Sequence, residues 1–179
     1  MVNIKSFYFN PYRECTYVVS NAAKQAIIID AGMYEDKEKQ RFLDYILSEQ
    51  LTPIALLITH THPDHVCGIE YLEQTYHLPI IVQPAEGKLD IDGFDIKIIS
   101  TPGHKEDAVC YYLPEENTLF TGDTLFQESI GRTDLPGGDM HTLICSLKKL
   151  VVLPEQTQVY PGHGYPTTIE HEKKYNPYL

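Results

Sequence analysis

Short apolar runs rich in β-branched and aromatic residues recur along the whole chain, and Gly, Pro or Asp ends several of them. These runs predict strands over residues 3–9, 15–20, 26–32, 54–60, 79–84, 94–100, 108–114, 118–123 and 158–164. Helical patterns between them predict helices over residues 35–48, 68–76 and 140–150, and a last short helix starting near Thr168. Strands mixed with helices throughout indicate one layered α/β unit, with two sheets covered by helices.

Length and composition limit the classes of protein that this chain can represent. Its 179 residues, of which 42% are hydrophobic, suit a single domain spanning residues 1–179. The formal net charge is -11 without a block of basic residues, which argues against nucleic acid or an anionic membrane as partner. No stretch approaches the roughly 18 apolar residues of a membrane span, and the start MVNIKSFYFN lacks a leader pattern. We therefore expect a cytoplasmic protein.

The four cysteines give no sign of a disulfide framework or a thiolate zinc site. Cys15, Cys67, Cys110 and Cys145 are widely spaced and form no CxxC motif. We expect reduced, mostly buried thiols. Cys67 lies near a group of histidines, but HxHxDH already fills the coordination positions and no base is spaced to activate the thiol. We therefore expect Cys67 to pack or to support the neighbouring ligand residues.

The segment THTHPDH at residues 59–65 gathers three histidines and an aspartate directly after an apolar run. Side chains alternate along an extended segment, so His60 and His62 should project the same way and reach one ion, while Asp64 and His65 begin the next turn. Desolvating these groups would be costly unless a divalent ion bound them. The spacing therefore predicts a metal site.

Three distant segments repeat this design, in which a strand ends in a ligand-type residue beside glycine: TPGH at His104, FTGD at Asp123 and PGH at His163. Glycine lets the backbone turn sharply or approach closely, as a site built from several loops requires. All seven side chains are nitrogen or oxygen donors, which suits zinc, iron or manganese. Seven ligands are too many for one tetrahedral ion, whereas two ions that share a carboxylate would use them all.

With these motifs in place, the chain resembles the metallo-β-lactamase superfamily over essentially its whole length. The resemblance implies a four-layer αββα sandwich with a dinuclear site at one edge of the two sheets. It also implies a bridging ligand, Asp123, and two ligand sets, namely His60, His62 and His104 for the first ion and Asp64, His65 and His163 for the second.

A water held between two divalent ions loses its proton near neutral pH and can attack a carbonyl carbon, which is the chemistry of a hydrolase. Two divalent ions outweigh the two aspartates and one hydroxide, so an acidic protein can still offer a cationic centre to an oxyanion. As a ligand of the same centre, Asp64 would lie close to this hydroxide and is a candidate for proton transfer. We therefore expect Asp64 and Asp123 to serve catalysis as well as metal binding.

The run TLFQESIGRTDLPGGD after Asp123 resembles the glyoxalase II branch, in particular short hydroxyacylglutathione hydrolase-like members. In that branch, the positions of Arg132 and Tyr165 contact the glutathione part of a thioester, so we expect a small anionic thioester or ester as substrate. Two features depart from the pattern. The helical domain that follows in full-length glyoxalase II is not expected, and Asp134 stands where a tyrosine is usual. Asp134 could also simply pair with Arg132.

Several alternatives remain open. The motif GRTD also resembles persulfide dioxygenases, whose single iron would be held by His60, His104 and Asp123. We prefer the hydrolase because the run LPGGD follows that motif, as in short hydrolase-like proteins. A lactone or ester hydrolase could use the same site. β-Lactamase activity is less favoured because many such enzymes place a cysteine where this chain has Asp123. A purely structural metal site without catalysis is also less favoured, because such a site is normally closed and four-coordinate, whereas this ligand set leaves room for water.

Some polar residues have simpler explanations. Asp30 closes the run AIIIDAG at the same strand edge as the ligands, so we expect it to hydrogen-bond to the metal cluster without being catalytic. His77, His141 and His171 are interpreted as ordinary loop or surface histidines.

Overall fold

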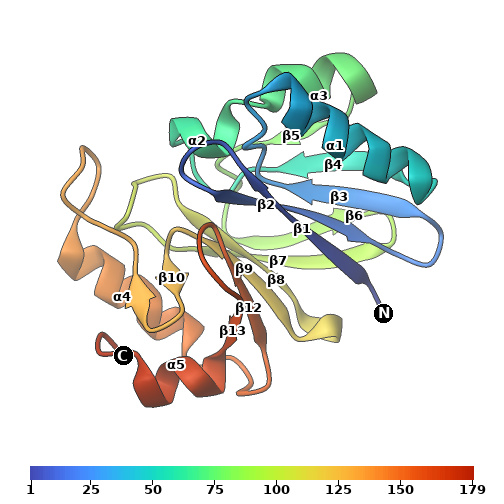
Figure 1. The fold of residues 1–179 in the computed structure, drawn as a ribbon. Coiled ribbons are helices and arrows are strands. Elements are labelled where there is room, and N and C mark those ends of the chain that lie inside the picture. The colour runs from blue at the N-terminus through green and yellow to red at the C-terminus, as the bar shows by residue number, and fades with distance from the viewer. The chain divides into compact units, whose positions relative to one another are not determined.

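The computed structural model describes all residues from 1 to 179, and the chain divides into two compact units, residues 1–82 and residues 83–179 (Figure 1). Each unit combines one large sheet with helices, so both belong to the α/β class. That the 179 residues form a single domain stays a prediction. No helix is long and apolar enough to cross a membrane.

The first unit contains a five-stranded sheet in the order β1-β2-β3-β4-β5. Its strands are β1 (Asn3–Phe9), β2 (Glu14–Ser20), β3 (Gln25–Ile29), β4 (Thr52–Leu57) and β5 (Ile80–Ile81). The first three strands run antiparallel, whereas β4 and β5 each lie parallel to the strand before them in the sheet. Parallel neighbours need a crossover, and helices supply both crossovers here.

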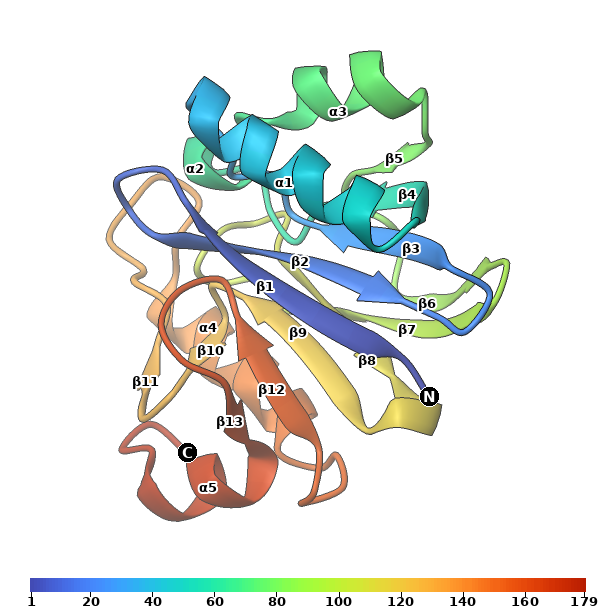
Figure 2. The same ribbon diagram turned by 45° about the vertical axis from the view of Figure 1, so that its right-hand side comes forward.

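Helix α1 (Asp36–Ser48) connects β3 to β4, while α2 (Pro63–Val66) and α3 (Ile69–Tyr76) connect β4 to β5. In Figure 2, α1 and α3 lie over the same face of the sheet. A capping box between Glu35 and Glu38 fixes the start of α1. The helices pack on the sheet through one apolar core, which includes Val18, Ile28, Leu56, Phe42, Ile46 and Leu72.

The second unit contains a six-stranded sheet in the order β13-β12-β9-β8-β7-β6 and a two-stranded β10-β11 hairpin. The large sheet consists of β6 (Gly87–Ile91), β7 (Phe94–Ser100), β8 (Val109–Leu113), β9 (Thr118–Gly122), β12 (Gln158–Pro161) and β13 (Thr167–Thr168). The hairpin consists of β10 (Leu125–Phe126) and β11 (Ser129–Ile130), and a 3-10 turn, η1 (Pro114–Glu116), joins β8 to β9.

Helix α4 (Met140–Leu150) makes the crossover from the β10-β11 hairpin to β12, and α5 (Ile169–Tyr175) follows β13. Leu143, Leu147 and Leu150 are buried in the core of this unit, as their shared helical face predicts. The Asp139 side chain caps α4 by accepting a hydrogen bond from the backbone N–H of Thr142 at 2.7 Å.

Several predicted strands are shorter in the structure, and β6, β10, β11 and β13 were not predicted. The strand expected over residues 26–32 ends at Ile29, and the one expected over residues 158–164 ends at Pro161. The strand expected over residues 54–60 ends at Leu57, and the one expected over residues 79–84 shrinks to Ile80–Ile81. Strand β6 was not predicted at all. It is the edge strand, where the charged side chains of Lys88 and Asp90 point to solvent, so it lacks the apolar run that marks a buried strand.

Candidate metal centre

The first unit places four of the predicted ligands in one short stretch that follows β4. Because β4 ends at Leu57, His60 and His62 lie in a loop beyond the strand, which corrects the expected strand geometry. His62 is the extended N-cap residue of α2, and Asp64 and His65 lie in that helix. The ring centroids of His60 lie 4.8 Å from His62 and 4.1 Å from His65. This stretch therefore brings the histidines together even without strand alternation.

Asp30 holds this loop through one buried carboxylate. It follows β3, and its backbone N–H donates to the carbonyl of Leu57 at the end of β4, so the carboxyl ends of two parallel strands meet here. Its Oδ1 accepts from the backbone N–H of Thr59 at 2.8 Å, and its Oδ2 accepts from the Thr59 hydroxyl at 2.8 Å. Oδ2 also lies 2.8 Å from Nδ1 of His65. The hydrogen bond that we expected from Asp30 to the histidine cluster is thus present.

These bonds determine which ring nitrogens carry protons. A carboxylate only accepts, so His65 donates its Nδ1 hydrogen to Asp30. The Thr59 hydroxyl gives its only hydrogen to Asp30 and must accept from Nδ1 of His60, which lies 3.1 Å away. In its neutral form each ring therefore carries its lone pair on Nε2, which is the form that binds a metal ion.

A second acidic side chain lies beneath the loop and has no counterpart in the sequence interpretation. Glu14 of β2 is fully buried and accepts a hydrogen bond from the Thr16 hydroxyl, with 2.9 Å between that oxygen and Oε2. Burial raises the pKa of the Glu14 carboxyl well above its ordinary value, and nearby His65 opposes this shift. A Cβ at Gly32 would overlap the Glu14 carboxyl group and lie 2.9 Å from the backbone oxygen of Asp64, so a side chain there would force the neighbouring groups to move.

The second unit places the other three ligands at one edge of its sheet. His104 follows β7, Asp123 follows β9 and His163 follows β12. Strands β9 and β12 are parallel, and β7 has the same direction because β8 is antiparallel to both β7 and β9. Oδ2 of Asp123 lies 3.5 Å from Nε2 of His104 and 3.7 Å from Nε2 of His163. The three donors thus converge around Asp123.

The loop after the β10-β11 hairpin sets the orientation of His104. Its Nδ1 lies 2.7 Å from the backbone carbonyl of Arg132, which can only accept, so Nε2 again keeps its lone pair. Gly131 makes this approach possible, since a Cβ there would lie 1.8 Å from the backbone oxygen of Asp123 and 3.1 Å from Cβ of His104. Nε2 of His60, His65 and His104 is therefore oriented as a nitrogen donor that suits a divalent metal ion.

The two predicted substrate contacts differ in their surroundings. The Arg132 guanidinium forms a bidentate pair with Asp134, in which Nε to Oδ1 and Nη2 to Oδ2 both measure 2.7 Å. The pairing that we considered for these two residues is therefore present, and Arg132 holds the pKa of Asp134 down at about 2. Tyr165 follows Gly164, whose φ is +85°, and its side chain is 72% exposed. Substrate contact by either residue stays a prediction.

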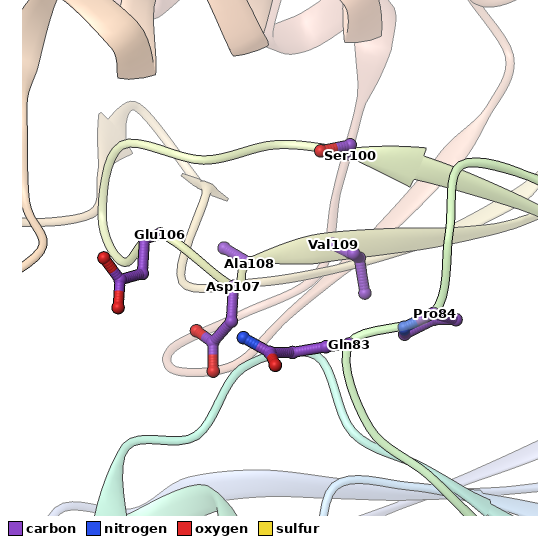
Figure 3. Close-up of a pocket in the computed structure, with 7 residues that line it drawn as sticks. All are labelled: Gln83, Pro84, Ser100, Glu106, Asp107, Ala108 and Val109. Atoms are coloured by element: carbon purple, nitrogen blue, oxygen red, sulfur yellow. The ribbon is translucent and has the colours of Figure 1, made fainter.

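A small polar pocket of about 160 Å³ lies elsewhere in the second unit (Figure 3). It is lined by Gln83, Pro84, Ser100, Glu106, Asp107, Ala108 and Val109. The side chains of Gln83 and Asp107 point toward one another there, and Lys105 pairs with Asp107 at 3.1 Å. None of the predicted site residues lines this pocket.

The cysteines are only partly as expected. All four are free thiols, but Cys67 and Cys145 are exposed, so the prediction of mostly buried thiols holds for Cys15 and Cys110 alone. The pKa of Cys67 is raised by desolvation and by the nearby Glu14 carboxylate, which does not favour an activated nucleophile.

Known proteins match this chain over nearly its full length. A family model described as the metallo-beta-lactamase superfamily matches residues 13–96 and 87–163. YqgX of Bacillus subtilis, a probable metallo-hydrolase, is 33% identical, and the match covers 87% of each chain. The hydroxyacylglutathione hydrolase GloC of Haemophilus influenzae is 31% identical over 99% of this chain and 98% of its own.

Solved structures agree with this relationship. BLEG-1, described as a B3 metallo-beta-lactamase, aligns with a TM-score of 0.94 and 34% identity over 99% of both chains. ETHE1 from Myxococcus xanthus aligns at 0.88 and 28% identity, covering 98% of this chain and 83% of its own. TTHA1623 in a di-iron-bound form aligns at 0.88 and 31% identity, covering 98% and 100%. The metallo-β-lactamase fold predicted from the motifs is therefore confirmed, and the chain belongs to the metallo-β-lactamase superfamily.

Proposed function

We propose that this protein is a dinuclear metal-dependent hydrolase that cleaves a thioester of the hydroxyacylglutathione type. The observation that carries the proposal is the hydrogen-bond partner on Nδ1 of His60, His65 and His104, which leaves Nε2 of each neutral ring as a metal donor. Similarity to GloC over nearly the full length of both chains supports the reaction class. Zinc is the metal that we favour, and iron or manganese would suit the same nitrogen and oxygen donors.

In this proposal, the ligand sets of the two units combine into one centre, with Asp123 shared between two ions. The first ion would be held by His60, His62 and His104, and the second by Asp64, His65 and His163. Ions bound there would lower the pKa of a water molecule and polarise the substrate carbonyl.

Other groups of the chain would orient the metal ligands and transfer protons. Asp30 and the Arg132 carbonyl hold their histidines in one tautomer and orientation, so the donor atoms need no rearrangement when ions bind. The Asp64 side chain is partly exposed and would take up or deliver a proton at its carboxylate next to the reacting carbonyl. A thiolate leaving group needs little protonation, which suits a site with few acids.

We further propose that Arg132 binds a carboxylate of the thiol part of the substrate. Its guanidinium already grips the Asp134 carboxylate in a bidentate pair, and a substrate carboxylate would take the place of Asp134. Replacing Arg132 with Ala should raise KM for S-lactoylglutathione and leave the metal content unchanged. Replacing Asp134 with Ala should lower KM, because the competing carboxylate is gone. If neither variant changes KM, Arg132 does not contact the substrate.

The test of the main proposal combines elemental analysis of the purified protein with hydrolysis of S-lactoylglutathione, with and without oxygen. About two metal ions per chain and oxygen-independent cleavage are expected if seven ligands hold two ions. The variants His62→Ala and Asp123→Ala should lose metal and activity together. Full activity with full metal content in either variant would contradict the ligand assignment. A β-lactam belongs in the substrate panel because of the likeness to BLEG-1.

A mononuclear iron dioxygenase acting on a persulfide is the second candidate, and the likeness to ETHE1 gives it some support. Its iron ligands would be His60, His104 and Asp123. About one iron per chain, together with oxygen uptake in the presence of a persulfide and no thioester cleavage, would favour this candidate.

A further inference from the structure

The first unit contains an apolar pocket of about 270 Å³ that adjoins a proposed metal ligand. We call it the tyrosine pocket, and it is lined by Asn10, Pro11, Tyr12, Tyr34, Pro63, Asp64 and Cys67. The loop between β1 and β2 forms one wall, the segment before α1 contributes Tyr34, and α2 contributes Asp64. A group bound in this pocket would lie next to Asp64.

One carboxylate holds two walls of the tyrosine pocket in place. Oε1 of Glu38, in the first turn of α1, accepts from the backbone N–H of Asn10 at 2.8 Å. Oε2 of Glu38 accepts from the backbone N–H of Tyr34 at 2.9 Å and from that of Glu35 at 3.0 Å. The β1-β2 loop and the Tyr34 segment are therefore tied to the same helix, so the pocket is formed before any ligand binds.

The Asn10 side chain links the β1-β2 loop to α2, the helix that contains Asp64. Its Nδ2 donates to the carbonyls of Gly32 and Asp64, both at 3.0 Å, and its Oδ1 accepts from the backbone N–H of Tyr12 at 3.0 Å. Asn10 has a φ of +50°, a conformation that asparagine tolerates better than most residues. These bonds fix the position of Tyr12 relative to Asp64.

The chemistry of the lining selects a neutral, apolar occupant. The rings of Tyr12 and Tyr34 are 74% and 66% exposed, so both offer apolar surface that a bound group could cover. The lining contains no lysine or arginine, and Asp64 is its charged member. The carboxylates of a thiol arm would find no lysine or arginine to pair with there, whereas an apolar acyl chain would remove both rings from water.

We propose that the tyrosine pocket receives the acyl group of the substrate, and that Tyr12 and Tyr34 make the enzyme prefer extended or aromatic acyl groups over short ones. This inference rests on the proposed thioester hydrolysis, and it names the part of the substrate that sets specificity.

The first test compares glutathione thioesters of acetate, butyrate, hexanoate and phenylacetate. For the wild-type protein, kcat/KM should rise about threefold to fourfold for each methylene that enters the pocket. The variants Tyr12→Ser and Tyr34→Ser should flatten this rise, so that the ratio of kcat/KM for the hexanoyl thioester to that for the acetyl thioester falls. Tyr178→Ser is the matched control, because Tyr178 is also an exposed tyrosine but does not line the pocket. A rise that is absent, or that persists in both pocket variants, would overturn the inference while thioester hydrolysis stands.

A second readout needs no catalysis. Cys67 lines the pocket and is exposed, whereas Cys145 is exposed elsewhere, so their rates of alkylation by iodoacetamide can be compared by mass spectrometry. Phenylacetamide should slow alkylation of Cys67 but not of Cys145, acetamide should slow neither, and Tyr12→Ser should abolish the protection. If no thioester is cleaved, the proposed function fails and this protection alone decides the inference. Unprotected Cys67 would then refute it.

Discussion

Replacing Asp30 with Asn tests whether one buried carboxylate sets the tautomer of His65, a proposed metal ligand. Asp30 has a φ of +60° and accepts hydrogen bonds from the Thr59 backbone, the Thr59 hydroxyl and His65. Asparagine has the same shape and tolerates positive φ, so the substitution adds no backbone strain. Alanine would be a poorer choice, because it would remove all three bonds and destabilise the unit as well.

The expected loss of metal affinity follows from the hydrogen bonds that Asp30 accepts. In the Asp30→Asn variant, the amide oxygen can still accept from the backbone N–H of Thr59, but an NH₂ group replaces Oδ2, which accepts two hydrogens in the native protein. His65 relieves the conflict by moving its proton from Nδ1 to Nε2, and it thereby loses the lone pair that would bind metal. Loss of such an orienting partner typically weakens metal affinity about 10-fold to 100-fold. This corresponds to about 1.4 to 2.8 kcal/mol of binding free energy.

Competition with a chromophoric chelator measures the zinc affinity, and ¹⁵N NMR of the imidazole nitrogens reports which nitrogen of His65 carries the proton. Asp36→Asn is the matched control, since it removes the same charge from a fully exposed side chain. Unchanged affinity together with a proton that stays on Nδ1 of His65 would refute the reasoning.

Three further predictions concern stability and reactivity. Glu172→Gln should cost about 1–3 kcal/mol of unfolding free energy in urea, because its buried carboxylate accepts three hydrogen bonds, whereas the exposed control Glu170→Gln should cost little. Iodoacetamide at pH 8 should label Cys145 and spare Cys110, since burial raises the pKa of the Cys110 thiol to about 11; equal labelling in the native protein would contradict this. Gly131→Ala should lower Tm, because its Cβ would lie 1.8 Å from a backbone oxygen, and an unchanged Tm would show that the loop can shift freely.

Part of the fold followed directly from local patterns. The apolar face of Leu143, Leu147 and Leu150 predicted α4, and the runs of β-branched residues predicted most strands. Such patterns are visible in the sequence because an element that buries one face in a core needs apolar residues at the spacing of that element. Strand β6 escaped prediction because an edge strand with charged solvent-facing residues shows no such run. Where β4 ends was also out of reach, since pairing to its neighbours, and not its own sequence, decides that point.

The candidate site, like the fold, could be predicted from the sequence only in part. The candidate ligands were visible in the sequence because few residue types bind metal and their spacing in THTHPDH is rarely produced by chance. The partners of those ligands were visible only in part. Asp30 was expected from its strand end, but the hydroxyl of Thr59 and the carbonyl of Arg132 carry no sequence signal, because any hydroxyl or any residue can supply such a group.

The sequence by itself determined the family, the fold class and the set of candidate ligands, because chemistry that needs particular side chains leaves them in fixed motifs. The tertiary structure alone decided which ring nitrogens keep a lone pair, which glycines admit no side chain, and that Tyr12 and Tyr34 line one pocket beside Asp64. These properties depend on contacts between residues far apart in the chain, such as that between Asp30 and His65, and no local pattern encodes such contacts.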